Sequence, residues 1–323
     1  MSNSNTSSKS NLLREMVKTA CASQELAGME TTVEKELLHY DIMAALSQSG
    51  LLAKLVFQGG TCLRMAYGSQ RLSEDLDFVG GVDFTPEAYQ DLAQVLIDYF
   101  RPRYGLDIRV KTPKDRVFQR DNLQQEKKVD VGRWMVSIET QPQAKDLPNQ
   151  KIKLEVANIP SYSSSTKAIK LNYPALQSGL STVLVNCETE EEILADKIVA
   201  LCLRNFIKAR DLWDLVMLEQ QGLAINDEWA FAKFKDYLPN KPQSVEEPLQ
   251  CLQQRLIELP GYWESGDFEN EMRRFLPRKK IQETFEQASF MAYFTDTINT
   301  LLNKTIARWE SSSTASHGEG FQL

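Results

Sequence analysis

Histidine is almost absent from this chain. Only His39 and His317 occur among 323 residues, which excludes a zinc site built from histidine and cysteine and a catalytic triad with a histidine base. Cysteine is also scarce, and its five residues lack the paired spacing of a metal site or a disulfide framework. That pattern favours reduced thiols and a cytoplasmic location. Chemistry in this chain is therefore expected to depend on carboxylates, lysine and a metal ion.

Long apolar runs and an excess of positive charge are missing too. No segment approaches the roughly 18 apolar residues of a spanning helix, so we expect no membrane association. A formal net charge of -7 argues against indiscriminate nucleic-acid binding. Two stretches are nevertheless basic: residues 101–133 contain ten Lys or Arg against five Asp or Glu, and a second cluster occupies residues 273–280. Each is either solvated surface or a contact for a phosphate backbone.

Two motifs follow each other between residues 57 and 78. The first, Phe57-Gln58-Gly59-Gly60-Thr61-Cys62-Leu63-Arg64, predicts a strand, a glycine turn and a helix, and the second, Arg71-Leu72-Ser73-Glu74-Asp75-Leu76-Asp77-Phe78, predicts another strand. Because side chains alternate along a strand, Ser73, Asp75 and Asp77 are expected on one face. Two close carboxylates repel each other unless a cation lies between them, and Mg2+ prefers oxygen ligands. The motifs therefore predict a site for a metal-bound nucleotide.

The glycine pair supplies the other half of this predicted site. Gly59 and Gly60 lack a Cβ, so the backbone can turn sharply and a phosphate can approach its amides. Thr61 adds a hydroxyl at the start of the following helix. We expect the phosphate at Gly60 and the metal at Asp75 and Asp77. A glycine turn beside a solvated acidic strand is the weaker alternative, because the two motifs occur in the expected order and spacing.

A third carboxylate is expected on another strand. Residues 151–157 alternate cleanly, which places Ile152, Leu154 and Val156 in the core and Lys153 and Glu155 on the opposite face. Glu155 is therefore a candidate metal ligand beside Asp75 and Asp77. The alternative is a glutamate on an edge strand that only interacts with the surroundings of Lys153.

The motifs also resemble those of known families. A glycine pair, a small hydroxyl residue and an Asp-x-Asp strand resemble the nucleotidyltransferase superfamily that includes polymerase beta. The finer pattern, Gly-Gly-Thr-x-Leu-Arg, Tyr-Gly and Arg-x-Ser-x-Asp-x-Asp-Phe, resembles the AbiEii-type nucleotidyltransferase toxins of type IV toxin–antitoxin and phage-defence loci. A second segment is similar to the same family, because Lys197 on a predicted helix precedes the sequence Arg-Asp-x-x-Asp-Leu at residues 210–215.

The resemblance implies a metal-dependent enzyme that transfers a nucleoside monophosphate from an NTP to an acceptor hydroxyl. In some relatives the acceptor is the 3′ end of tRNA, the modification inhibits translation and growth, and a cognate antitoxin protein is the usual partner. The implied cofactor is Mg2+ or Mn2+. The implied catalytic residues are Asp75, Asp77, Lys197 and Asp211, the metal ligands are Asp75, Asp77 and Glu155, and the nucleotide-binding residues are Gly59, Gly60, Thr61, Arg71, Ser73 and Lys197.

Several alternatives remain open. One alternative acceptor is a small molecule. Another is a protein hydroxyl, which would make the chain a protein-modifying nucleotidyltransferase or kinase with Ser73 as a nearby target. A nucleotide-binding module without turnover is the least favoured alternative. A continuous helix would place Arg204 and Asp211 on the face of Lys197, whereas the structural alternative makes Asp211 an N-cap and Lys197 a solvated charge. Asp214 and Trp213 are interpreted as structural. Arg64 and Arg71 either neutralise phosphate or pair with Glu74.

The predicted fold class is α+β, with a polymerase-beta-like nucleotidyltransferase core containing a small mixed sheet and a following α-helical C-terminal domain. The predicted divisions are a disordered tail at 1–11, the nucleotidyltransferase domain with N-terminal helices at 12–187, the helical domain at 188–310 and a flexible tail at 311–323. Expected strands span 54–58, 72–79, 106–111, 128–139 and 151–159. Expected helices span 12–27, 32–48, 61–66, 86–99, 190–204, 211–220, 228–237, 246–259, 268–276 and 280–309.

Overall fold

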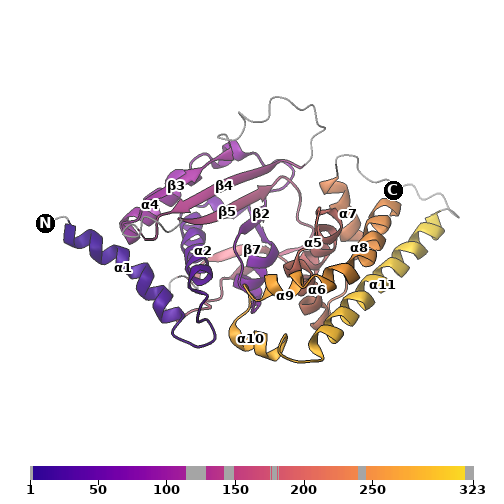
Figure 1. Cartoon of the computed structure of the whole chain (residues 1–323). Coiled ribbons are helices and arrows are strands. Elements are labelled where there is room, and N and C mark those ends of the chain that lie inside the picture. The colour runs from indigo at the N-terminus through magenta and orange to yellow at the C-terminus, as the bar shows by residue number, and fades with distance from the viewer. Residues whose placement is uncertain are drawn as a thin grey trace. The chain divides into compact units, whose positions relative to one another are not determined.

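The chain forms two compact units, whose main boundary falls between Glu188 and Thr189. The computed structural model describes residues 3–113, 129–141, 149–174, 176, 180, 182–238 and 245–316. The first unit contains a mixed sheet with helices, and the described part of the second contains only helices (Figure 1). This arrangement confirms the predicted α+β class. No helix within the described ranges is long and apolar enough to cross a membrane.

The described strands of the first unit form one seven-stranded sheet in the order β3-β4-β5-β2-β1-β7-β6. The pairs β1–β7 and β2–β5 are parallel, and the other neighbouring pairs are antiparallel. The motif strands β1 and β2 therefore lie inside the sheet and not at its edges. The strands are β1 (Val56–Gln58), β2 (Leu76–Val79), β3 (Ile108–Lys111), β4 (Val131–Ile138), β5 (Gln150–Ala157), β6 (Ser164–Ala168) and β7 (Leu184–Glu188).

The alternation predicted for β5 is confirmed. Ile152, Leu154 and Val156 are fully buried, whereas Lys153 and Glu155 lie on the other, partly exposed face. On β2 and β1, Phe78 and Phe57 stack in the same core with their ring centroids 5.0 Å apart. The buried face is what holds these short strands in register, because a slip of one residue would expose it.

Helices α1, α2 and α4 pack on one another, and α2 and α4 also contact strands β5 and β3. Helix α1 begins at Asn3, inside the segment expected to be a tail, because its apolar residues Leu13 and Met16 anchor a helix that continues toward the N-terminus. The helical elements are α1 (Asn3–Ala20), α2 (Glu30–Gln48), η1 (Leu51–Lys54), α3 (Gly59–Cys62), the π-helical turn η2 (Leu63–Tyr67), η3 (Pro86–Tyr89) and α4 (Leu92–Tyr104).

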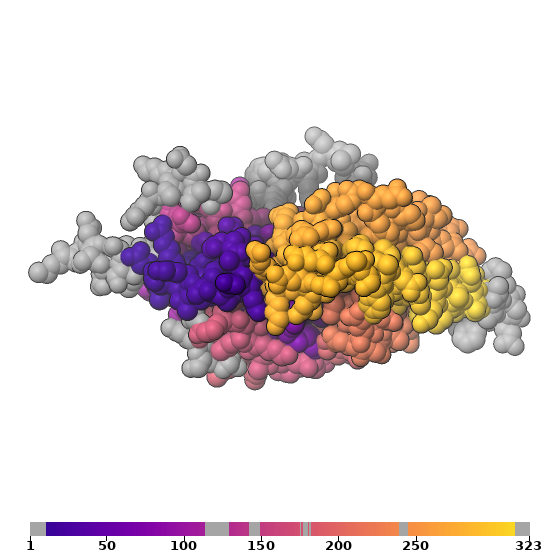
Figure 2. All heavy atoms as spheres, turned by 60° about the horizontal axis from the view of Figure 1, so that its bottom comes forward, coloured from indigo at the N-terminus to yellow at the C-terminus, as the bar shows by residue number. Residues whose placement is uncertain are grey.

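The second unit is built around aromatic side chains. Trp213 is almost completely buried and contacts the rings of Phe285, Phe290 and Phe294, which confirms its predicted role in packing. Figure 2 shows the C-terminal helices, in orange and yellow, forming one continuous surface of this unit. Its helices are α5 (Glu190–Leu203), α6 (Ala209–Gln220), α7 (Asp227–Tyr237), α8 (Glu246–Glu264), α9 (Asp267–Met272), α10 (Arg278–Glu283) and α11 (Phe290–Ser316).

Three sequence expectations about these elements were wrong. The helix expected over 280–309 is interrupted, because Thr284 leaves helical geometry and Phe285 turns into the aromatic cluster. Strands β6 and β7 were not expected, since β6 is a polar edge strand and β7 is only five residues long. The flexible tail predicted at 311–323 was wrong for residues 311–316, because α11 continues through them. Residues 317–323 lie outside the described residues, as do residues 114–128 of the first basic stretch.

Buried ion pairs connect elements within each unit. In the first, Arg64 of η2 donates to both carboxylate oxygens of Glu36 on α2, at 2.9 and 3.1 Å, and the Tyr173 hydroxyl donates to the same carboxylate. In this structure Arg64 therefore pairs with Glu36 and not with Glu74. In the second, the ammonium group of the fully buried Lys233 lies 2.8 Å from Glu192 and 2.8 Å from Asp196.

We predict that Arg64→Met lowers the free energy of unfolding of the first unit by about 3–5 kcal/mol, because Glu36 is completely buried and would lose its counterion. Urea titration of the purified protein measures this change. The double variant Glu36→Met/Arg64→Met should be less destabilised than the single variant, since it leaves no buried charge. A double variant that is at least as unstable as Arg64→Met would contradict this explanation.

Candidate active site

The glycine turn directly follows β1 and faces Asp77. Gly59 adopts a left-handed conformation with φ +75°, and a Cβ built on it would lie 3.4 Å from Oδ2 of Asp77. The turn leads into α3, whose Thr61 is buried. A residue with a side chain would therefore be strained at position 59, and its Cβ would contact the carboxylate of Asp77. The backbone turn and one predicted catalytic aspartate are thus adjacent.

Arg71 lies beneath the second glycine of the turn. A Cβ on Gly60 would overlap the guanidinium group of Arg71, whose side chain is almost fully buried and donates from Nη1 to the Leu72 carbonyl at 3.2 Å. Position 60 must therefore remain glycine for the arginine to occupy this place. The structure brings a positive charge next to the turn, as expected for a nucleotide-binding residue, but covers it from solvent.

Hydrogen bonds hold the segment that carries Asp75. Strand β2 begins at Leu76, one residue after Asp75, so strand alternation does not place this aspartate as we expected. The Thr61 hydroxyl instead donates to the Asp75 carbonyl, and the Thr61 and Ser73 hydroxyls are hydrogen-bonded at 2.8 Å. Ser73 is buried, so its hydroxyl supports this segment from inside.

His39 of α2 fixes the same segment from the other side. Its Nε2 lies 3.1 Å from the Glu74 carbonyl oxygen. Burial lowers the pKa of His39 to about 4, so the ring is neutral at pH 7 and donates its proton to that carbonyl. The sequence offered no signal for this contact, because it depends on a helix that lies 35 residues earlier in the chain.

Three predicted carboxylates meet across the sheet. The parallel register of β2 and β5 places Asp77 opposite Glu155. Lys153, two residues before Glu155, extends its ammonium group to 3.2 Å from Oδ2 of Asp75 and 3.2 Å from Oε2 of Glu155. The guanidinium of Arg133, opposite Glu155 on β4, donates to the other oxygen of Glu155. The structure thus brings Asp75, Asp77 and Glu155 to one place and adds two cations.

Electrostatics explain why Lys153 remains charged there. Partial burial acts to lower its pKa, but the negative charges of Asp75, Glu155 and Asp77 outweigh that effect and raise the pKa of Lys153. Neither Lys153 nor Arg133 was predicted to belong to the site. The alternation on β5 placed Lys153 on the correct face, but the contacts depend on the register between strands.

The donor set of this site fits a divalent metal ion. Within the described ranges, no group of three or more His, Cys, Asp or Glu side chains is arranged to hold one. Mg2+ nevertheless needs only one or two carboxylates, because it keeps several waters and takes phosphate oxygens from its substrate. Asp75 and Asp77 provide that number, and the ammonium of Lys153 beside them shows that a cation is stable at this position.

A second cluster of charges forms in the helical unit. Nζ of Lys197 on α5 lies 2.8 Å from Asp211 and 2.8 Å from Asp214 on α6, and Nε of Arg204 lies 3.0 Å from Asp211. Helix α5 ends at Leu203, so tertiary folding and not one continuous helix unites these residues. Asp211 is not an N-cap, because α6 begins two residues before it, and Asp214 pairs with Lys197 directly.

Asp211 is held in its ionised form. Burial on its own acts to raise the pKa of Asp211, but the charges of Lys197 and Arg204 lower it to about 2. Lys197 is almost completely buried between two carboxylates. The cluster therefore holds an ionised Asp211 against the ammonium group of Lys197, which also contacts Asp214.

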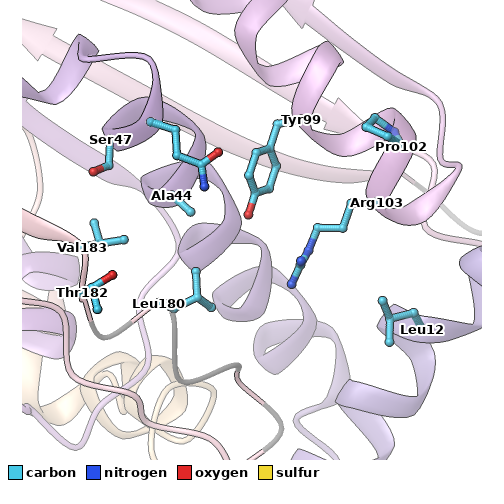
Figure 3. Close-up of a pocket in the computed structure, with 10 residues that line it drawn as sticks. Leu12, Ala44, Ser47, Tyr99, Pro102, Arg103, Leu180, Thr182 and Val183 are labelled. Carbon is cyan, nitrogen blue, oxygen red and sulfur yellow. The ribbon is translucent and has the colours of Figure 1, made fainter.

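The first unit also contains an open pocket of about 680 Å3, but none of the predicted site residues lines it. Tyr99 and Arg103 extend from α4 toward α2 at its wall (Figure 3). Arg103 there pairs with the buried Asp41 at 2.9 Å. The Tyr99 hydroxyl donates to the same carboxylate at 3.4 Å, so both of these side chains contact the buried Asp41.

Comparison with known proteins identifies the class. The family described as nucleotidyl transferase AbiEii toxin, type IV TA system, matches residues 41–299. The chain therefore belongs to the AbiEii nucleotidyltransferase toxin family. This confirms the resemblance that the motifs indicated, and it makes the chain a member of an enzyme family whose reaction is nucleotidyl transfer.

Among solved structures, the chain is similar to JHP933 from Helicobacter pylori, at 17% identity and a TM-score of 0.45, over 89% of this chain and 97% of that one. It is also similar to a candidate nucleotidyltransferase from H. pylori, at 18% identity and a TM-score of 0.42, over 87% and 96%. No protein of curated function matches the chain.

We predict that Gly60→Ala lowers the free energy of unfolding of the first unit by about 1–3 kcal/mol, since the new methyl group displaces the buried Arg71 guanidinium. Urea titration in a double-mutant cycle tests the cause. In an Arg71→Ala background the same glycine change should cost much less, because the overlapping atoms are gone. Equal costs in both backgrounds would show that the guanidinium does not impose the glycine.

We predict that the stabilising effect of Asp211 depends on pH in a defined window. The pKa of this group is lowered to about 2 in the folded state from an ordinary value of 3.8. Its contribution is therefore fully present above pH 3.8 and disappears as the pH falls through about 2. Urea titrations of wild type and Asp211→Asn between pH 7 and this range measure the difference in free energy of unfolding.

The control for this experiment is Glu247→Gln, which removes an exposed acid from the same unit. Its difference from wild type should stay small throughout. A difference between wild type and Asp211→Asn that begins to shrink at neutral pH would contradict the assignment of a low pKa to Asp211.

Proposed function

We propose that the chain is a metal-dependent toxin that transfers a nucleoside monophosphate from an NTP to the 3′ hydroxyl of tRNA. One observation carries the proposal. In a chain of a nucleotidyltransferase family, the glycine turn lies against Asp77, and Asp77 is opposite Glu155 on the neighbouring strand. Lys153 joins the carboxylates of Glu155 and Asp75. The acceptor hydroxyl attacks the α-phosphorus, the bond to the β-phosphate oxygen breaks, and pyrophosphate leaves. The original 3′-terminal nucleotide of the tRNA thereby loses its free hydroxyl, which blocks aminoacylation.

In this proposal, different residues of the first unit bind the metal ion, bind the phosphates and position the backbone. Asp75 and Asp77 would hold the divalent ion, which would supply Lewis-acid activation of the hydroxyl and neutralise the leaving oxygens. The amides of Gly59 and Gly60 receive the phosphates, with the charge of Arg71 behind them. Thr61, Ser73 and His39 hold the backbone around Asp75 so that its carboxylate is preorganised.

The residues of the second unit contribute charge. The family resemblance assigns Lys197 to the triphosphate, and Asp211, which remains ionised, orients that lysine together with Asp214. Glu155 joins the metal ligands only if it exchanges its present partners, Arg133 and Lys153, for the ion.

Exposed basic residues support an RNA acceptor. Arg101, Arg109 and Lys111 of the first basic stretch are exposed, as are Arg274, Arg278 and Lys279 of the second. Lysines and arginines in such positions track a phosphate backbone. A protein acceptor at Ser73 is disfavoured, because this residue is buried and hydrogen-bonded to Thr61. A small-molecule acceptor would not need the basic residues. A cognate antitoxin completes the system.

The proposal is tested with purified protein, total bacterial RNA, Mg2+ and each α-labelled NTP in turn. We predict label in a tRNA-sized band with wild type, and a loss of roughly 100-fold or more with Asp75→Asn, because a metal ligand should matter at least as much as its supporting residues. Asp98→Asn, an exposed aspartate of α4, is the matched control and should label normally.

Expression in growing bacteria provides a second readout, in which wild type should stop growth and Asp75→Asn should not. Equal toxicity of the two proteins would refute the proposed mechanism. RNA that stays unlabelled with every nucleotide would refute the tRNA acceptor, and label in a small molecule or in the protein would then identify the alternative.

A further inference from the structure

Lys153 occupies the centre of the carboxylate group. Its ammonium lies 3.2 Å from an oxygen of Asp75 and 3.2 Å from an oxygen of Glu155, and it also interacts electrostatically with Asp77. Asp75 and Asp77 are the carboxylates to which the proposed function assigns the metal ion. The chain therefore already supplies a cation where the bound metal would have to be.

The charges favour an exchange of one cation for the other. Asp75, Asp77 and Glu155 carry three negative charges, and Lys153 and Arg133 carry two positive charges. The group therefore has one net negative charge. A divalent ion in place of the ammonium makes the group neutral. A divalent ion added beside the ammonium would leave a net positive charge and place two cations close together, which is unfavourable.

The ammonium group of Lys153 can move away from the carboxylates. Its side chain is 30% exposed, and its four-carbon stem rotates freely, so the ammonium can reach water without any backbone movement. Arg133 differs, because its planar guanidinium is bound to Glu155 from the directly opposite position on β4. Arg133 therefore stays and keeps Glu155 neutralised, while Lys153 is the cation that exchanges.

We propose that Lys153 is a built-in counterion that holds the place of the divalent metal ion in the free protein and swings out when the ion arrives. This inference rests on the proposed function, since it concerns the same site. The consequence is weak metal binding by the free protein. Once released, the ammonium remains tethered to β5 beside the site, where the phosphate oxygens of an NTP offer it a new anionic partner.

Binding of Mn2+ alone to the full chain, without nucleotide, tests this inference. Free Mn2+ is counted by electron paramagnetic resonance during a titration. Lys153→Met keeps the length of the stem and removes the charge, and we expect it to bind Mn2+ about tenfold more tightly than wild type. Lys151→Met is the matched control, because this exposed lysine is on the same face of the same strand, opposite Ser137, and its loss should leave the affinity unchanged.

A merely structural lysine would give a different result, because its removal would weaken the site or leave its affinity for Mn2+ unchanged. Either result overturns the inference, as does an equal gain in Lys151→Met. Lys153→Gln repeats the test if the methionine variant unfolds, and urea titration checks the fold of each variant. The outcome is independent of the RNA-labelling experiment: labelling with unchanged Mn2+ affinity refutes only the counterion, whereas tighter Mn2+ binding without labelling refutes only the proposed reaction.

Discussion

The parallel pairing of β2 with β5 is the constraint on which the site of the first unit depends. It places Asp77 opposite Glu155, and the antiparallel pairing of β5 with β4 then places Arg133 opposite the same glutamate. Like charges in neighbouring rows of a sheet repel, so this register is stable only with cations beside it. Lys153 and Arg133 meet that requirement in the free protein. The same repulsion favours a divalent cation beside these carboxylates, so one register relates the stability of the strands to the proposed metal site.

Both units bury ionised groups, and each group has a partner from another element. Glu36 and Arg64 join α2 to η2, Lys233 joins α7 to α5, and Lys197 joins α5 to α6. Such pairs add little to stability relative to apolar residues, but they penalise every arrangement in which one partner is missing. They therefore select one packing of the elements next to the glycine turn and of the helices that carry Lys197 and Asp211. Precise placement of charge is what a transferase of phosphate groups requires.

The parts of the site that the sequence predicted are those encoded locally. The glycine turn, the aspartates and the alternation that exposes Glu155 follow from residues a few positions apart, and the core residues of β5 follow from the same alternation. The parts that were missed depend on distant partners. Arg64 was misjudged because its carboxylate, Glu36, lies 28 residues earlier, and the contacts of His39 and Lys153 depend on tertiary packing and strand register. Asp75 lies outside the strand, where hydrogen bonds replace alternation.

The position of β7 also affects how the chain folds. This strand pairs in parallel with β1, with Phe57 opposite Cys187, although about 130 residues separate them in the sequence. A ribosome that has translated both aspartates and the glycine turn has therefore not yet made the strand that lies beside that turn in the finished sheet. The nascent chain completes its sheet only after the first unit has been synthesised almost to its end. The sheet of this unit is consequently completed late in synthesis, and a fragment that stops before β7 lacks the parallel neighbour of β1, the strand that leads into the glycine turn.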